Sequence, residues 1–201
     1  MAFASEAGVI RIETLKSDAS RANDGNGDIE MLAALLHACV RAGASVSFVL
    51  PFSHEDAKAF WIDQVLPGVA AGTRSLLIAR LSNRIIGTVQ LDLATPPNQP
   101  HRAEVRKLLV HPDVRRRGIA KALMIAVDQV ARTARRTLLT LDTVTGGPAE
   151  RLYQSLGYFS LGSIPRYALN FDSRVLESTT VMYKDLTTSE QGKVHSFSLT
   201  E

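Results

Sequence analysis

Apolar residues recur at a period close to 3.6 in several parts of the chain, which predicts amphipathic helices. We predict helices over residues 28–43, 53–67, 119–132 and 148–156. Asp28 and Ser53 stand where N-cap residues are preferred, and Pro148 suits the first turn of the last helix. Pro67, with the glycine that follows it, is expected to interrupt the second helix, and Gly157 is expected to end the fourth.

Shorter runs rich in β-branched and apolar residues predict strands. These runs are Val9–Leu15, Ser75–Leu81, Arg84–Leu93, Ala103–Val110, Leu138–Leu141, Tyr158–Leu161 and Ser178–Tyr183. The second and third are joined by Ser82-Asn83, which indicates a hairpin. A further short apolar segment, Val46–Leu50, ends at Pro51, and Ser17–Asp28 is polar and rich in turn residues.

The order of these elements predicts a mixed α/β (α+β) fold with a central, mostly antiparallel sheet flanked by helices. Length favours one domain, which we place over residues 1–186, because ~100–200 residues is typical of a single domain. Residues 187–201 are polar and are expected to form a flexible tail. The 201 residues contain no internal repeat.

Composition argues against several classes of protein. Hydrophobic residues make up 45% of the chain and charged residues 21%, which is ordinary for a globular protein. Cys39 is the one cysteine and the five histidines are scattered, so we expect neither disulfides nor a metal site. The N-terminal segment lacks the basic start of a signal peptide, and no apolar run approaches the ~18 residues of a membrane span. We therefore expect a cytoplasmic protein that binds no metal and no membrane.

Charge is informative through its arrangement. The net charge of +3 is too small to indicate nucleic-acid binding by itself, although the isoelectric point is about 9.2. Basic residues concentrate in the middle of the chain, at Arg102, Arg106, Lys107, Arg115, Arg116, Arg117, Lys121, Arg132, Arg135 and Arg136. This concentration favours a polyanionic ligand at one place.

The most informative stretch runs from Val110 to Ala120, where a predicted strand ends, a basic loop follows and Gly118 opens a helix. Helix N-termini carry unpaired N–H groups and a partial positive charge, so each arginine of this loop is unfavourable there by ~0.3–1 kcal/mol. A bound pyrophosphate would compensate this repulsion, and Gly118 permits its close approach to the backbone. A solvated basic loop accounts for the same charges about equally well.

Two segments resemble motifs of one enzyme family. Arg115-Arg116-Arg117-Gly118-Ile119-Ala120 resembles the (Gln/Arg)-x-x-Gly-x-(Gly/Ala) pyrophosphate loop of the GNAT acetyltransferases, and Leu109–Pro112 before it resembles the end of their fourth strand. Ala149–Tyr158 is similar to their Ala-x-x-x-Tyr-x-x-x-Gly-(Phe/Tyr) segment. The motifs occur in the family's order and at its usual separation, and the resemblance covers about Leu77–Leu186.

The resemblance implies acetyl-CoA as cosubstrate, bound where the sheet splays between its fourth and fifth strands. It implies that backbone groups of Leu108, Leu109 and Val110 contact the pantetheine arm. The pyrophosphate would be held by Arg115, Arg116, Arg117, Gly118, Ile119 and Ala120. Gly146 departs from the family, which often has asparagine at this position. Within the family, Leu141-Asp142-Thr143, the Ala149–Tyr158 block and Ile164-Pro165-x-Tyr167 resemble most the tabtoxin-resistance-type enzymes.

Acyl transfer from a thioester to an amine needs a neutral amine, an oxyanion stabiliser and an acid for the departing thiolate. Tyr153 matches the family's catalytic tyrosine and would also contact the cofactor; without the resemblance, packing is the commoner reason for a tyrosine there. Glu104 and Asp142 are candidate bases. An ion pair between Glu104 and Arg106, or capping of a turn by Asp142, explains each about equally well. The backbone N–H near Leu109 or Val110 is the expected oxyanion donor.

These observations favour an N-acetyltransferase that moves acetyl directly from acetyl-CoA to a small polar amine, either amino-acid-like or an antibiotic. One alternative is acetylation of a protein N-terminus or lysine. Another is a non-catalytic module that binds acyl-CoA or nucleic acid; the presence of Tyr153 and of the acidic candidates disfavours a sensor. We expect no nucleic-acid partner, and a homodimer only because twofold assemblies are the commonest.

Overall fold

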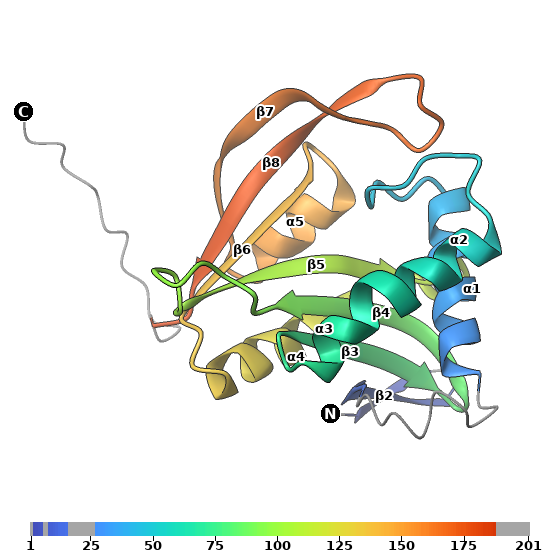
Figure 1. Cartoon of the computed structure of the whole chain (residues 1–201), viewed down its shortest axis with the longest axis horizontal. Helices are drawn as coiled ribbons and strands as arrows, with labels where there is room; N and C mark the ends of the chain where they lie inside the picture. Colours follow the sequence, from blue (N-terminus) through green and yellow to red (C-terminus); the bar gives the residue numbers. More distant parts are fainter. Residues whose placement is uncertain (1, 6–7, 16–26, 188–201) are drawn as a thin grey trace, which may run out of the picture.

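The computed structural model describes residues 2–5, 8–15 and 27–187. Within these residues, the strands form one eight-stranded sheet in the order β1-β2-β3-β4-β5-β6-β8-β7 (Figure 1). The strands are β1 (Ala2–Ser5), β2 (Gly8–Thr14), β3 (Arg74–Leu81), β4 (Arg84–Asp92), β5 (Arg102–Val110), β6 (Leu138–Val144), β7 (Phe159–Leu169) and β8 (Leu176–Asp185). The mixed, sheet-centred fold predicted from the sequence is confirmed.

All neighbouring strands of this sheet pair antiparallel except β5 and β6, which are parallel. Their ladder contains three residue pairs, from Arg102 opposite Leu138 to Glu104 opposite Thr140. Beyond Glu104, β5 pairs with β4 alone. These two strands are the fourth and fifth when the short β1 is left out, so the predicted splay lies where the sequence placed it.

Helices cover both faces of the sheet. They are α1 (Asp28–Arg41), α2 (His54–Ala59), the π-helical η1 (Phe60–Val65), α3 (Leu66–Ala70), the 3-10 turn η2 (Pro112–Val114), α4 (Ile119–Thr133) and α5 (Pro148–Ser155). An α4-side core contains Leu123, Val127, Val105 and Leu141. An α1-side core on the opposite face contains Leu36, Trp61, Leu76 and Leu109.

The residues predicted to begin or interrupt helices do so in some cases and not in others. Ser53 caps α2 as predicted: its Oγ accepts from the Asp56 N–H at 3.0 Å, and Asp56 accepts in return from the Ser53 N–H at 2.8 Å. The prediction that Asp28 caps α1 is wrong, because Asp28 is the first helical residue and its carboxylate binds Arg80. Pro67 does not interrupt the helix either. It lies in the first turn of α3, directly after the π-helix, where a missing N–H is tolerated.

The last hairpin is much longer than predicted. β7 and β8 pair from Phe159 opposite Tyr183 to Leu169 opposite Leu176, with shifts of register after Ser160 and Ile164. Its far end reaches the loop between α1 and α2 (residues 42–53), where the Leu50 N–H donates to the Phe171 carbonyl at 2.7 Å. The apolar segment Val46–Leu50 belongs to this loop and joins no ladder of the described sheet. Apart from Thr187, the predicted polar tail lies outside the described residues.

Gly87 on β4 lets α4 pack closely on the sheet, and its replacement by alanine should destabilise the protein. A Cβ there would lie 3.0 Å from the Leu109 carbonyl oxygen and 3.2 Å from side-chain carbons of Ile119 and Leu123. Because backbone on one side and a buried helix on the other must both move, we expect Gly87→Ala to lower the free energy of unfolding by ~1–3 kcal/mol. Urea denaturation measures this loss. A loss below ~0.5 kcal/mol would contradict the close packing.

Candidate active site

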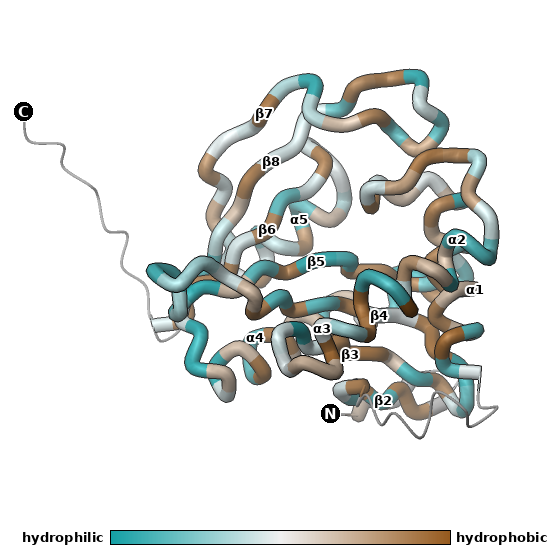
Figure 2. Tube along the Cα trace, in the orientation of Figure 1, coloured by the Kyte–Doolittle hydropathy of each residue, from teal (hydrophilic) through white to brown (hydrophobic). Residues whose placement is uncertain are grey.

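A bulge in the middle of β5 determines which side chains face the α1-side of the sheet. Gln90 of β4 lies opposite Arg106, whereas Thr88 lies opposite Leu109, so β5 has one residue more than β4 in this interval. Lys107 takes a positive φ of 51° at the irregularity. Ala103 and Val105 belong to the α4-side core and Leu109 to the α1-side core, so the bulge reverses the alternation of the strand. Figure 2 shows that the middle of β5, where the bulge lies, is hydrophilic.

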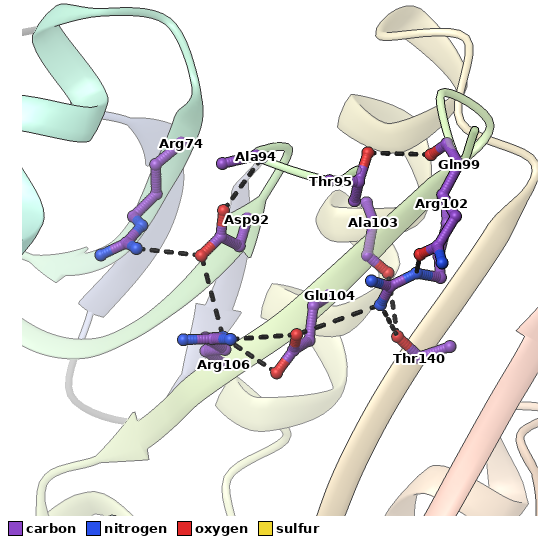
Figure 3. A network of polar contacts seen from close by, with 10 residues as sticks. All are labelled: Arg74, Asp92, Ala94, Thr95, Gln99, Arg102, Ala103, Glu104, Arg106 and Thr140. Carbon is purple, nitrogen blue, oxygen red and sulfur yellow. Dashed lines mark hydrogen bonds and ion pairs between the residues drawn. The ribbon is translucent and has the colours of Figure 1, made fainter. Parts of the chain in front are cut away.

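Charged side chains of β3, β4 and β5 form a continuous network that reaches β6 through Thr140 (Figure 3). Arg74 donates to Asp92 at 2.9 Å, and Arg106 Nε lies 3.8 Å from the same carboxylate. Arg106 also donates to both oxygens of Glu104, at 2.9 and 3.0 Å. Arg102 connects the network to β6 through a 3.0 Å hydrogen bond to Thr140 Oγ1. The network therefore ties the strands together just where the splay begins.

Glu104 is fully engaged in this network. Both of its carboxylate oxygens accept from Arg106, and Arg102 lies 4.0 Å away. The ion pair that the sequence left as an alternative is thus present, and a carboxylate held in this way is better suited to positioning Arg106 than to accepting a proton. The role of Glu104 as a base stays a prediction.

Asp142 lies beyond the three-residue ladder, on the β6 side of the splay. Its neighbours Leu139 and Leu141 belong to the α4-side core, which places Asp142 on the opposite face with Thr140. The carboxylate is exposed and accepts a 3.0 Å hydrogen bond from Thr179 Oγ1. The pKa of Arg106 is raised mainly by Glu104, that of Lys107 is lowered and that of Tyr153 raised mainly by burial, and in all three the charge of Asp142 favours the protonated form. Asp142 therefore acts electrostatically on β5, across the opening, and on α5.

Tyr153 approaches the opening from the other face. It belongs to α5 and is buried in the α4-side core, with its ring centroid 5.6 Å from that of Tyr158. Burial, and then the charge of Asp142, raise the pKa of the Tyr153 hydroxyl above its ordinary value. The hydroxyl consequently keeps its proton at neutral pH, as an acid for a departing thiolate must.

Lys107 is a site residue that sequence reasoning missed. It lies on the same face as Arg106, and burial followed by the charge of Arg106 lowers its pKa to about 8.

The N-terminus of α4 has the properties of a phosphate site. Gly118 has a φ of 77°, and a Cβ there would meet no atom within 4 Å. No side chain caps the helix, so the N–H groups of its first turn, at Ile119 and Ala120, are available to a ligand. Arg116 and Arg117 are exposed beside this turn. A pyrophosphate fits these residues because it would satisfy both the N–H groups and the arginines.

Arg115 occupies a different place from the rest of the basic loop. Its Nε donates to the Val110 carbonyl at 3.1 Å, and the buried Cys39 thiol contacts the same oxygen at 3.5 Å. The side chain thus secures the end of β5. Leu108 and Val110 pack on the α4-side core at the splayed edge. Their predicted contacts with pantetheine, and that of Arg115 with pyrophosphate, stay predictions.

Gly146 replaces the asparagine that the family often has. It takes a φ of 74°, and its N–H donates to Glu150 at 2.6 Å while its carbonyl accepts from Arg151 at 3.0 Å. Side chains of α5 therefore hold the turn that leads from β6 into that helix. The turn needs no asparagine side chain for its own geometry.

The described residues contain no group of histidine, cysteine and acidic side chains arranged to hold a metal ion. In the same part of the chain no helix is long and apolar enough to cross a membrane.

The edge strand β7 exposes several large apolar side chains, at Phe159, Leu161, Ile164, Tyr167 and Leu169. The homodimer stays a prediction.

Residues 31–158 match the acetyltransferase (GNAT) family, and the chain belongs to that family. An uncharacterized N-acetyltransferase from the hisH–hisA intergenic region of Azospirillum brasilense is 30% identical over 136 residues, covering 67% of this chain and 73% of that protein. The chain is thus an acetyl-CoA-dependent N-acetyltransferase, as the motifs indicated.

Solved structures share the fold. The yncA protein of Salmonella typhimurium, solved with its cofactor acetyl-CoA, superposes with a TM-score of 0.67 at 16% identity, covering 92% of this chain and 96% of that one. A ribosomal-protein-alanine N-acetyltransferase from Brucella melitensis superposes with a TM-score of 0.70 at 18% identity, over 88% of this chain and 99% of its own.

Proposed function

We propose that the chain acetylates a small polar amine by direct transfer, with the acceptor ammonium bound at Asp142. The supporting observation is the exposed Asp142 carboxylate at the splayed edge of β6, on the face opposite the Tyr153 core. The acceptor would reach Asp142 from the α1-side. The cofactor, with its pyrophosphate at the α4 N-terminus, would extend its thioester into the splay, where the two reacting groups would meet. An amino-acid-like compound or an antibiotic fits this acceptor class.

In the proposed mechanism, residues on the α1-side of the sheet bind the amine, and residues on the α4-side bind the cofactor and protonate the leaving group. Acetyl-CoA, when bound, supplies the acetyl thioester. Gly118 and the first turn of α4 hold its pyrophosphate, and the backbone N–H near Leu109 or Val110 stabilises the oxyanion. Asp142 orients the amine, and Tyr153 delivers a proton to the departing sulfur. Glu104 holds the Arg106 side chain in place through two hydrogen bonds.

Two finer assignments belong to the same proposal. The segments Leu141-Asp142-Thr143 and Ile164-Pro165-x-Tyr167 support a place among tabtoxin-resistance-type enzymes, which favours a small acceptor. Acetylation of a protein N-terminus is the second candidate, supported by the similarity in fold to the Brucella ribosomal-protein-alanine enzyme. A panel of amines separates them: the twenty amino acids, dipeptides, aminoglycosides, and peptides beginning with alanine or serine, each assayed for release of coenzyme A thiol. Turnover of the peptides alone would overturn the small-acceptor proposal.

Replacing Asp142 by asparagine should impair use of the amine. A hydrogen bond to a charged group contributes ~1.5–3 kcal/mol, so we expect Asp142→Asn to lower kcat/KM for the best amine of the panel by ~10- to 150-fold. Stabilisation by acetyl-CoA should be unchanged. The matched control is Asp63→Asn, which removes the same charge from an exposed position of η1. Equal kinetics for the two variants would contradict the assignment of Asp142.

A further inference from the structure

The ammonium end of Lys107 is enclosed by the α1–α2 loop and by two aromatic rings. Its Nζ donates to the Val46 carbonyl at 2.7 Å and to Ser47 Oγ at 3.0 Å. The same nitrogen lies 5.3 Å from the centroid of the Phe48 ring and 5.9 Å from that of Phe60. The side chain is half-buried on the face that carries Arg106 and Asp142.

This environment accommodates both protonation states of the side chain. A neutral amine has two N–H groups, and the two oxygens satisfy both of them, which leaves the lone pair free to accept a proton. The protonated form gains a third N–H, and the aromatic faces offer it a cation–π contact. A side chain that fits its surroundings in either state is suited to proton transfer.

The charges around Lys107 favour a neutral amine at moderately alkaline pH. Arg106 on β5 and Arg74 on β3 disfavour the ammonium form, whereas Asp142 on β6 favours it. The α1–α2 loop and η1 contribute a carbonyl, a hydroxyl and aromatic rings at this nitrogen. With burial as the largest influence, the pKa of Lys107 lies at about 8, against ~10.4 for a free lysine.

We propose that Lys107 is the general base of the acetyl transfer, an inference that rests on the proposed small-amine function. The neutral Nζ takes one proton from the acceptor ammonium held at Asp142. The amine nitrogen then forms a bond to the acetyl carbon while the carbon–sulfur bond breaks, and the sulfur receives a proton from Tyr153. The proton that the nitrogen loses on becoming an amide passes to the Tyr153 oxygen through the site's solvent, and Lys107 returns its own to water.

Basicity favours this lysine over a carboxylate. An alkyl ammonium and an ordinary carboxylic acid differ by ~6 pKa units, so direct transfer to a carboxylate is strongly uphill. Transfer to an amine with a pKa of about 8 is much less so. Glu104 has both oxygens engaged by Arg106, which leaves Lys107 as the better acceptor on this face.

The ionisation of Lys107 is tested without turnover. The chain contains six lysines, and carbon-13 labelling of their ε-carbons gives six NMR signals that titrate with pH. The signal missing from Lys107→Arg identifies Lys107. We expect its midpoint near pH 8, at least two pH units below that of free lysine. A midpoint above pH 10 overturns the proposal, because such a lysine stays charged at working pH.

Two variants separate a base from a mere positive charge. Arginine keeps the charge and can contact the loop but does not lose its proton in proteins, whereas methionine is neutral. If Lys107 is the base, Lys107→Arg and Lys107→Met should both lose at least ~100-fold in kcat with the best amine of the panel. The control Lys58→Arg, at a position of α2 where the ammonium pairs with Glu30, should keep wild-type kcat.

The wild-type kcat should fall tenfold per pH unit below about pH 8 and level off above it. The residual kcat of both variants should go on rising towards the pKa of the acceptor ammonium, because only the neutral amine then reacts. Full activity of Lys107→Arg, with loss in Lys107→Met alone, would show that only the charge matters and overturn the proposal. If the wild type acetylates no small amine, the proposed function is wrong, and the assignment of Lys107 as base is wrong with it. If the wild type and Lys107→Arg are both active, only the assignment of Lys107 as base is wrong.

Discussion

Tyr153→Phe is expected to lower kcat by ~100- to 10,000-fold, the contribution typical of a positioned general acid. The change removes one hydroxyl from a ring that is buried among apolar neighbours, so the fold should be retained. Because burial raises the pKa of this hydroxyl, the wild-type group is protonated throughout the neutral range and no limb of the pH–rate profile below pH 9 should belong to it. Steady-state kinetics of coenzyme A release measure the loss.

Tyr158→Phe is the matched control. Tyr158 packs against the same ring, and its own hydroxyl is buried without a hydrogen-bond partner among the described residues. Removing that hydroxyl should therefore leave kcat within about threefold of wild type and stability unchanged or slightly higher. A large kcat loss in both variants would point to packing in place of acid catalysis, and wild-type activity in Tyr153→Phe would remove this tyrosine from the mechanism.

Gly118→Asp is expected to abolish binding of acetyl-CoA. The new carboxylate would stand at the uncapped N-terminus of α4, where it would compete with the pyrophosphate for the N–H groups and repel it. At ~100 times its dissociation constant, acetyl-CoA should stabilise the wild type by ~2.7 kcal/mol. A thermal-shift titration should show this saturable rise in Tm for the wild type and none for the variant.

Gly118→Asn separates the effect of the new charge on acetyl-CoA binding from the effect of backbone strain. Asparagine has nearly the same shape, adopts the left-handed conformation about as readily, and meets the same open space. It should therefore cost as much stability as aspartate yet keep most of the acetyl-CoA shift. Equal loss of the shift in both variants would attribute the effect to backbone strain, and an unchanged shift in Gly118→Asp would place the pyrophosphate elsewhere.

The sequence was most informative where function depends on neighbours in the chain. The basic loop and Gly118 are contiguous, so a charge pattern at a helix start was enough to single them out, and the resemblance to the GNAT pyrophosphate loop then favoured a binding site over a solvated loop. The runs rich in β-branched and apolar residues predicted β3, β4 and β5 to within one residue at each end. Ser53 could be identified because an N-cap is a local signal, satisfied by Asp56 three residues later.

Other features depend on partners far along the chain. Asp28 looked like a cap, but Arg80, distant in sequence, offers it two hydrogen bonds. β7 was predicted four residues long because Gly162 and Pro165 break its pattern, and only pairing with β8 extends it. The lowered pKa of Lys107 arises from enclosure by the α1–α2 loop, which no local pattern around residue 107 records.

Trp61 is the one tryptophan of the chain and is fully buried in the α1-side core. Its indole packs 5.2 Å from the Phe60 ring, which in turn lies beside the Lys107 nitrogen. Leu109, which is expected to contact the pantetheine arm, belongs to the same core. The single indole therefore lies close to the places proposed for both substrates, and its intrinsic fluorescence should change when either of them enters the splay.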